Sequence, residues 1–121
     1  MNPSNQAVRI DLQDWQAVCS RHDLVPNSGV VARLGDAQVA LFYLPEAAQV
    51  LYAVDNHDPQ SGANVIGRGI IGSLKGQPVV AAPLYKQHFS LLDGRCLEDP
   101  QQVLRVWAVR FNGDCVEVAA L

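Results

Sequence analysis

The chain is poor in the residues that usually mark metal sites or crosslinked folds. Only three of its 121 residues are cysteines, Cys19, Cys96 and Cys115, and no two of them form a Cys-x-x-Cys pair. Their odd number and wide spacing indicate neither a disulfide framework nor a zinc site. We therefore expect three reduced, packed thiols in a cytoplasmic protein.

Long apolar runs and an excess of positive charge are also missing. No apolar run approaches the roughly 18 residues that a membrane-spanning helix requires. The first residues, MNPSNQAVRIDL, lack the basic and apolar regions of a signal peptide. The formal net charge is −3 and no basic stripe occurs. We expect neither a membrane anchor nor a nucleic-acid partner.

What the chain does have is short apolar runs between frequent turn signals. Hydrophobic residues make up 49% of it, enough for one domain spanning residues 1–121 to hold a core. The spacing of runs and turns predicts an all-β fold of antiparallel sheets with little helix. The predicted strands are Trp15–Cys19, Val30–Leu34, Gln38–Tyr43, Val50–Val54, Ile70–Ser73, Val79–Ala82, His88–Leu91, Leu104–Arg110 and Cys115–Ala119.

Two hairpins are predicted from their turn residues. Asn112-Gly113 lies between two alternating apolar runs, and Gly35-Asp36 lies between two others. The stretch Leu44–Val50 has the composition for one or two helical turns at most. Residues 55–99 are richer in Gly and Pro, which predicts a loop-rich subdomain on a more regular β base.

Two loops of this subdomain share an outline with a known family. The first is Asn56-His57-Asp58-Pro59-Gln60, and the second is Ala82-Pro83-Leu84-Tyr85, followed by Phe89 and by Asp93-Gly94. This frame resembles the Rieske iron–sulfur family, in which the loops carry Cys-x-His and Cys-x-x-His. The resemblance places the four ligand positions at Asp58, Gln60, Ala82 and Tyr85. None of the four is a cysteine or a histidine, so we expect a degenerate [2Fe–2S] site and no cofactor or metal in this chain.

A closer resemblance covers the chain from about residue 15 to its end. Asn56-x-Asp58-Pro59 and Pro83-Leu84-x-Lys86-Gln87-x-Phe89, with the Gly67-Arg68-Gly69 segment between them, are similar to the small subunit of assimilatory NAD(P)H-dependent nitrite reductase. That family is Rieske-like and lacks the cluster ligands. The resemblance implies a large catalytic subunit as partner. It also implies that FAD, an iron–sulfur cluster and sirohaem reside in that large subunit, where nitrite is reduced to ammonium.

Several side chains also allow other interpretations. Asp58 before Pro59 could be a general base, although a loop Asp is more often a turn residue. Asp58, His57 and His88 could bind a metal, and Arg68 between two glycines could bind an anion, but packed or solvated side chains explain them as well. Cys96 has no base placed beside it by the sequence, and Trp107 is most simply a core residue.

We interpret the chain as a non-catalytic accessory subunit of a nitrite reductase in nitrate assimilation, which binds and stabilises the large subunit. Side-chain packing by Leu84 and Tyr85, with polar contacts from Asp58, Lys86 and Gln87, would then replace the cluster as the support of the loops. Candidate partner contacts are Asn56, Asp58, Arg68, Lys86 and Gln87. The alternatives are a stand-alone Rieske-type electron-transfer ferredoxin and an independent small-molecule or metal-binding module.

Overall fold

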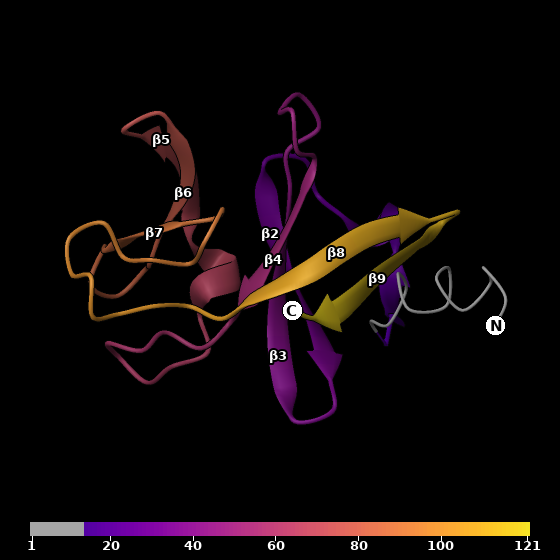
Figure 1. The fold of residues 1–121 in the computed structure, drawn as a ribbon, viewed down its shortest axis with the longest axis horizontal. Helices are drawn as coiled ribbons and strands as arrows, with labels where there is room; N and C mark the ends of the chain where they lie inside the picture. The colour runs from indigo at the N-terminus through magenta and orange to yellow at the C-terminus, as the bar shows by residue number, and fades with distance from the viewer. Residues whose placement is uncertain (1–13) are drawn as a thin grey trace, which may run out of the picture.

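The computed structural model describes residues 14–121, and within this range the protein consists almost entirely of strands and loops (Figure 1). Residues 1–13, for which no signal peptide is expected, lie outside the described range. Each strand begins and ends within two residues of its predicted bounds, so the all-β prediction is confirmed. The elements are β1 (Gln16–Ser20), η1 (Arg21–Asp23), β2 (Ser28–Leu34), β3 (Ala37–Tyr43), β4 (Leu51–Asp55), η2 (Ile66–Arg68), β5 (Ile70–Leu74), β6 (Gln77–Ala81), β7 (His88–Ser90), β8 (Val106–Asn112) and β9 (Cys115–Ala120).

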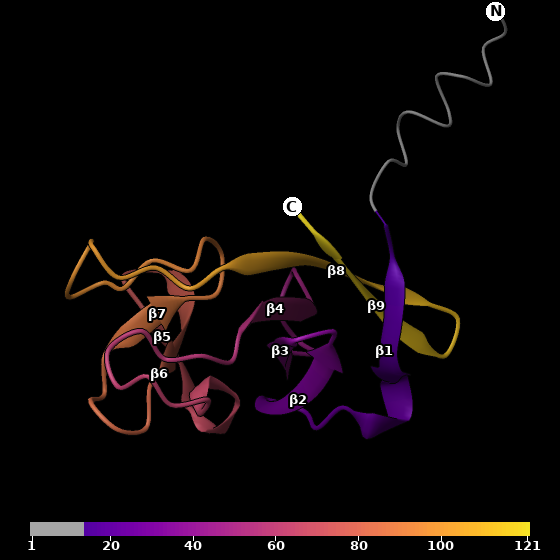
Figure 2. The same cartoon turned by 90° about the horizontal axis from the view of Figure 1, so that it is seen from below.

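The strands form two antiparallel sheets. The larger has the order β1-β9-β8-β4-β3-β2, and the smaller has the order β5-β6-β7. The chain leaves the larger sheet after Asp55 and returns to it at Val106. The smaller sheet and its loops lie at one end of the molecule in both views (Figures 1 and 2). The segment predicted to be loop-rich, residues 55–99, makes up most of this end.

Helical structure is limited to single 3-10 turns in the described part of the chain. The turns η1 and η2 were not predicted, and the stretch Leu44–Val50 forms turns and bends instead of a helix. No helix within residues 14–121 is long and apolar enough to cross a bilayer.

The two predicted hairpins are present, and one turns a residue later than expected. The β2–β3 hairpin turns at Gly35 and Asp36, as predicted. In the β8–β9 hairpin Asn112 pairs with Cys115, so the turn consists of Gly113 and Asp114 and not of Asn112-Gly113. Pairing in this register keeps both inward-facing valines of β9 in the core, and a slip of one residue would turn them outward.

Strand β3 is buried on both faces, which explains its uninterrupted apolar sequence VALFY. Val39 and Leu41 face the core of the larger sheet, where they pack with Trp107, Val116 and Val118. Ala40 and Phe42 face the smaller sheet, where they pack with Val80, Ala82, Phe89 and Leu91. The second of these cores therefore holds the two-loop end of the molecule against the larger sheet.

Trp107 is a core residue, as expected, with 7% of its surface exposed. Its indole Nε1–H donates to Oδ1 of Asp55 at 2.8 Å. The guanidinium of Arg105 stacks over its ring, 3.9 Å from the centroid. These contacts tie the return of the chain into β8 to the end of β4.

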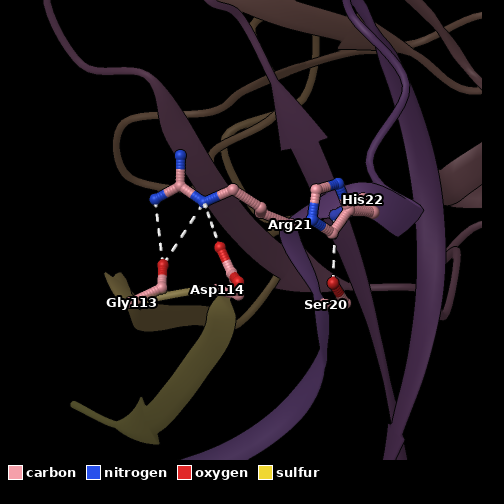
Figure 3. Close-up of polar contacts among 5 residues, drawn as sticks. All are labelled: Ser20, Arg21, His22, Gly113 and Asp114. Atoms are coloured by element: carbon pink, nitrogen blue, oxygen red, sulfur yellow. Dashed lines mark hydrogen bonds and ion pairs between the residues drawn. The ribbon is translucent and has the colours of Figure 1, made fainter.

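The turn η1 is fastened to the β8–β9 turn (Figure 3). The β8–β9 turn lies at the end of the molecule away from the smaller sheet (Figures 1 and 2). The Arg21 guanidinium donates to the Gly113 carbonyl at 3.1 and 3.3 Å and lies 3.9 Å from the Asp114 carboxylate. The same group stacks over Phe111 at 4.0 Å. The Ser20 hydroxyl caps η1 by accepting the backbone N–H two residues ahead. These contacts fasten the segment that follows β1 to the turn between β8 and β9.

Candidate functional site

The first loop is organised by Asp58, whose side chain is fully buried. Its Oδ1 accepts the backbone N–H of Gln60 at 2.9 Å. Its own backbone N–H donates to the Ala63 carbonyl, and its carbonyl accepts from the Gly62 N–H. This is the behaviour of a turn-forming Asp. A carboxylate enclosed by its own loop is badly placed to act as a general base on a substrate.

Asn56 fastens the first loop to the rest of the protein, and only 2% of its surface is exposed. Its amide donates to Oε1 of Gln38 and to the carbonyl of Asn64, and its Oδ1 accepts the backbone N–H of Gly67 at 2.7 Å. A side chain at Gly67 would collide with a methyl group of Val31 and crowd this same Oδ1. The glycine is therefore required so that η2 can approach Asn56 closely.

The second loop is closed by its own backbone. The Ala82 N–H donates to the Gln87 carbonyl at 2.8 Å, and the Lys86 N–H donates to the Ala82 carbonyl at 2.9 Å. Lys86 has a φ of 63°, which lets the chain reverse. Ala82 is 1% exposed and packs in the core between the sheets, whereas Leu84 and Tyr85 form an exposed tip.

A chain of glutamines joins the two loops through a third segment. The Gln102 amide donates to Oε1 of Gln60 in the first loop and, at 3.0 Å, to Oδ2 of Asp99. Its Oε1 accepts the amide of Gln87 from the second loop at 3.2 Å. Gln102 did not figure among the sequence candidates, since an isolated glutamine carries no pattern that predicts a partner. Its side chain connects the two loops by hydrogen bonds, as a polar substitute for the cluster would have to do.

The polar contacts differ from those expected in one respect. No ion pair joins Asp58 to Lys86 within residues 14–121, and Lys86 has no side-chain hydrogen bond there. Oδ2 of Asp58 and Oε1 of Gln87 are both buried without a hydrogen-bond partner. Leu84 and Tyr85 are exposed, so the packing expected from them is also absent. Burial of Ala82 and the links through Gln102 support the loops instead, and Lys86 is left free at the surface.

The remaining histidine candidates make polar contacts within the protein, and the remaining cysteine candidate has a thiol of low reactivity. Nδ1 of His88 lies 2.7 Å from Oε2 of Glu98, and the His88 backbone N–H donates to Oε1 at 2.8 Å. Burial would raise the pKa of Glu98, but these contacts with His88 outweigh it and bring the pKa below its ordinary value. Burial raises the pKa of the Cys96 thiol, which makes it a weak nucleophile. His57 faces Asn64 at 3.1 Å.

These histidines do not converge on a metal site. Within residues 14–121, no group of three or more His, Cys, Asp or Glu side chains is arranged to hold a metal ion.

Arg68 ends η2 beside the second loop, where a surface cavity of about 230 Å³ separates the two segments. Arg68 and Lys86 are the charged residues that line it, with Ile70, Ala82 and Pro83 among its apolar walls. Of the proposed contact residues, Arg68 and Lys86 are exposed and Gln87 is half-buried. Asn56 and Asp58 are buried and so offer no surface to a partner. Both are polar loop residues, and their burial follows from hydrogen bonds within the protein.

Comparison with known proteins assigns this architecture to a class. The family model described as the Rieske-like [2Fe-2S] domain matches residues 14–119, and the chain belongs to this family.

Within the family, the chain is homologous to nitrite reductase small subunits. It is 37% identical to the nitrite reductase (NADH) small subunit of Escherichia coli K12, over 88% of this chain and 98% of that protein. The solution structure of the E. coli protein NirD superposes with a TM-score of 0.80 and covers 90% of this chain and 98% of its own.

A further relative is much longer than this chain. The nitrite reductase [NAD(P)H] large subunit of Klebsiella oxytoca is 43% identical over 104 residues, which are 86% of this chain and 11% of that protein. A domain of this kind therefore occurs both as a separate chain and as a segment of a large subunit.

The side chains at the four ligand positions do not fit the cluster after which the family is described. A Rieske cluster takes two thiolates on one iron and two imidazoles on the other. Here Asp58 holds its own turn, Gln60 bonds Gln102, Ala82 contributes a methyl group to the core, and Tyr85 lies at the exposed tip. The loops keep the outline of a cluster site while their residues are used for packing and hydrogen bonding.

Proposed function

We propose that this chain is a small accessory subunit of NAD(P)H-dependent nitrite reductase, which binds and stabilises the large catalytic subunit in the cytoplasm. The large subunit would carry FAD, an iron–sulfur cluster and sirohaem and would reduce nitrite to ammonium. This chain would carry no cofactor and perform no chemical step.

The observation that carries the proposal is the occurrence of the same domain within the large subunit of K. oxytoca. A domain joined covalently to its partner is present at a high effective concentration, on the order of millimolar for a short flexible link. A separate domain lacks the covalent link, so it must bind the same partner through its own surface contacts. The similarity to separate small subunits over 98% of their length supports this reading.

The site geometry supports a role in binding. Asp58 and Asn56 are polar loop side chains that could serve as a base or a ligand. Both instead accept hydrogen bonds from backbone N–H groups of this protein. The exposed groups are those of the tip, Leu84 and Tyr85, and the two cations Arg68 and Lys86. Exposed apolar groups flanked by charge are typical of a protein contact surface.

The test is to purify the large subunit from the same organism with and without this chain. Nitrite-dependent NADH oxidation and its half-life during incubation are then compared. The proposal predicts a longer half-life or higher activity when this chain is added. Equal activity and equal half-life in both samples would refute it.

The ferredoxin alternative is tested on the isolated chain. Metal analysis and visible absorption are expected to show neither iron nor a charge-transfer band. Stoichiometric iron with such a band would instead favour a stand-alone electron carrier.

A further inference from the structure

The part of the chain that builds the smaller sheet contains no acidic residue. Residues 59–92 contain three lysines or arginines, namely Arg68, Lys75 and Lys86, and no Asp or Glu. The rest of the chain contains six lysines or arginines and twelve acidic residues. The acids of this end of the molecule lie in the flanking segments, as Asp58, Asp93 and Glu98 do, so the excess of positive charge is local to residues 59–92. A local excess of this kind favours an acidic group of a partner beside these residues.

Two of the three cations meet at the cavity beside the second loop. Arg68 comes from η2 and Lys86 from the second loop, and both line this cavity, which has a volume of about 230 Å³. Neither makes an ion pair or a side-chain hydrogen bond with any residue in the range 14–121. The nearest acids in sequence do not neutralise them, because Asp58 is enclosed in its own loop and Asp93 pairs with Arg95.

One large exposed apolar side chain lines the same cavity, and two more belong to the adjoining loop tip. Ile70, which lines it, is 77% exposed, and Leu84 and Tyr85 at the adjoining tip are 56% and 60% exposed. Ile70 begins β5, which is an edge strand of the smaller sheet. Apolar groups gathered around unpaired cations combine the two features that mark an interface, an apolar centre and complementary charge.

We propose that this basic, apolar-rimmed tip, formed by Arg68, Ile70, Leu84, Tyr85 and Lys86, is the surface that binds the large subunit. The inference rests on the proposed function and specifies where and by which chemistry the contact is made. A carboxylate of the large subunit enters the cavity, where the Arg68 fork and the Lys86 ammonium bind it. Apolar side chains beside that carboxylate pack on Ile70, Leu84 and Tyr85.

The protein offers a closely matched control for the charge. Lys75 and Lys86 are both exposed lysines with positive φ, 52° and 63°, and neither has a side-chain partner within residues 14–121. Lys75 lies at the turn of the β5–β6 hairpin, whereas the cavity adjoins the opposite end, where Ile70 pairs with Ala81. At about 3.3 Å per residue, the two ends of β5 are about 13 Å apart.

The charge test therefore compares Lys86→Glu with Lys75→Glu. The Kd of each variant for the purified large subunit is measured by calorimetry at low and high salt. Lys86→Glu should raise Kd at least about tenfold and reduce its salt dependence, whereas Lys75→Glu should change it less than about threefold.

A second pair of variants tests the apolar part. Leu84 and Leu92 each lie within a three-residue turn and are 56% and 53% exposed. Leu84→Ser should weaken binding by about tenfold, and Leu92→Ser should leave the Kd within about twofold of the original. All four side chains are exposed, so thermal unfolding of the isolated variants should match that of the unaltered chain.

The outcomes separate the site from the function. If the unaltered chain does not bind the large subunit, the proposed function itself fails. If it binds and both Lys86→Glu and Leu84→Ser bind equally well, the tip is not the contact and only the present inference is overturned. Sedimentation of this chain alone gives a third check. Dimers that Lys86→Glu dissociates would show that the tip binds a second copy, which also overturns the inference.

Discussion

Removing the Gln102 side chain should loosen the two loops, because Gln102 is the residue through which they are linked. In Gln102→Ala the hydrogen bonds to Gln60, Gln87 and Asp99 are lost. Each net hydrogen bond contributes about 0.5–1.5 kcal/mol, and these are partly exposed. The expected loss in the free energy of unfolding is therefore about 1–2 kcal/mol, or about 3–8 °C in Tm for a domain of this size.

The neighbouring residue supplies the control. Gln101 is exposed, and its side chain makes no hydrogen bond with any residue in the described range, so Gln101→Ala should leave Tm within about 1 °C. Thermal unfolding by circular dichroism measures both variants. Amide hydrogen exchange should show faster exchange of the Ala82 N–H in Gln102→Ala. Equal Tm for the two variants, with unchanged exchange in both loops, would refute the view that Gln102 links the loops.

Substitutions at three further positions test the loop and its surroundings. Asp58→Ala should lower the free energy of unfolding by about 1–2 kcal/mol because the partly buried backbone N–H of Gln60 loses its acceptor. Asp58→Asn, which keeps an oxygen there, should cost less in a urea titration, and an equal Tm for the alanine variant and the unaltered chain would contradict this. Glu98 has a lowered pKa in the folded protein, so its pairing with His88 stabilises the fold above the ordinary Glu pKa of 4.5 and is lost as pH falls through the lower, folded value. Stability measured from pH 6 to 3 should therefore fall less steeply in Glu98→Gln, by a small amount because the pair is half-exposed, and identical slopes would count against the ion pair. Gly94→Ala should cost more than about 2 kcal/mol, since φ is 81° and the added carbon would collide with the Leu104 carbonyl, and a variant that melts normally would show that this contact is not required.

The strands could be predicted because each carries its own apolar pattern. Alternation across Val106–Asn112 and the double-sided burial of β3 follow from side chains whose direction is fixed by a period of two. The turn at Asn112 was misplaced by one residue because Asn and Gly both accept positive φ. The register was decided instead by which side chains of β9 face the core.

The support of the loops could not be predicted in the same way. Asn56 and Asp58 were expected at a surface, since polar loop residues usually face water. Both are buried, and their side chains accept backbone N–H groups, of Gly67 for Asn56 and of Gln60 for Asp58. Gln102 lies 42 residues after Gln60, and no local sequence pattern predicts the hydrogen bond between them. The four positions that the resemblance assigns to ligands carry neither Cys nor His in the sequence itself. The contacts that support the loops instead are made by long, flexible glutamine side chains, and their partners are set only when the chain has folded.

Binding between the two subunits is the measurement that addresses the proposed function most directly. The large subunit and this chain, purified separately and mixed at micromolar concentrations, would be resolved by size-exclusion chromatography with light scattering. The account predicts a single species that contains both chains in a fixed ratio and dissociates when the tip carries Lys86→Glu. Two separate peaks with the masses of the free chains, at low salt and with the large subunit fully loaded with its cofactors, would contradict it.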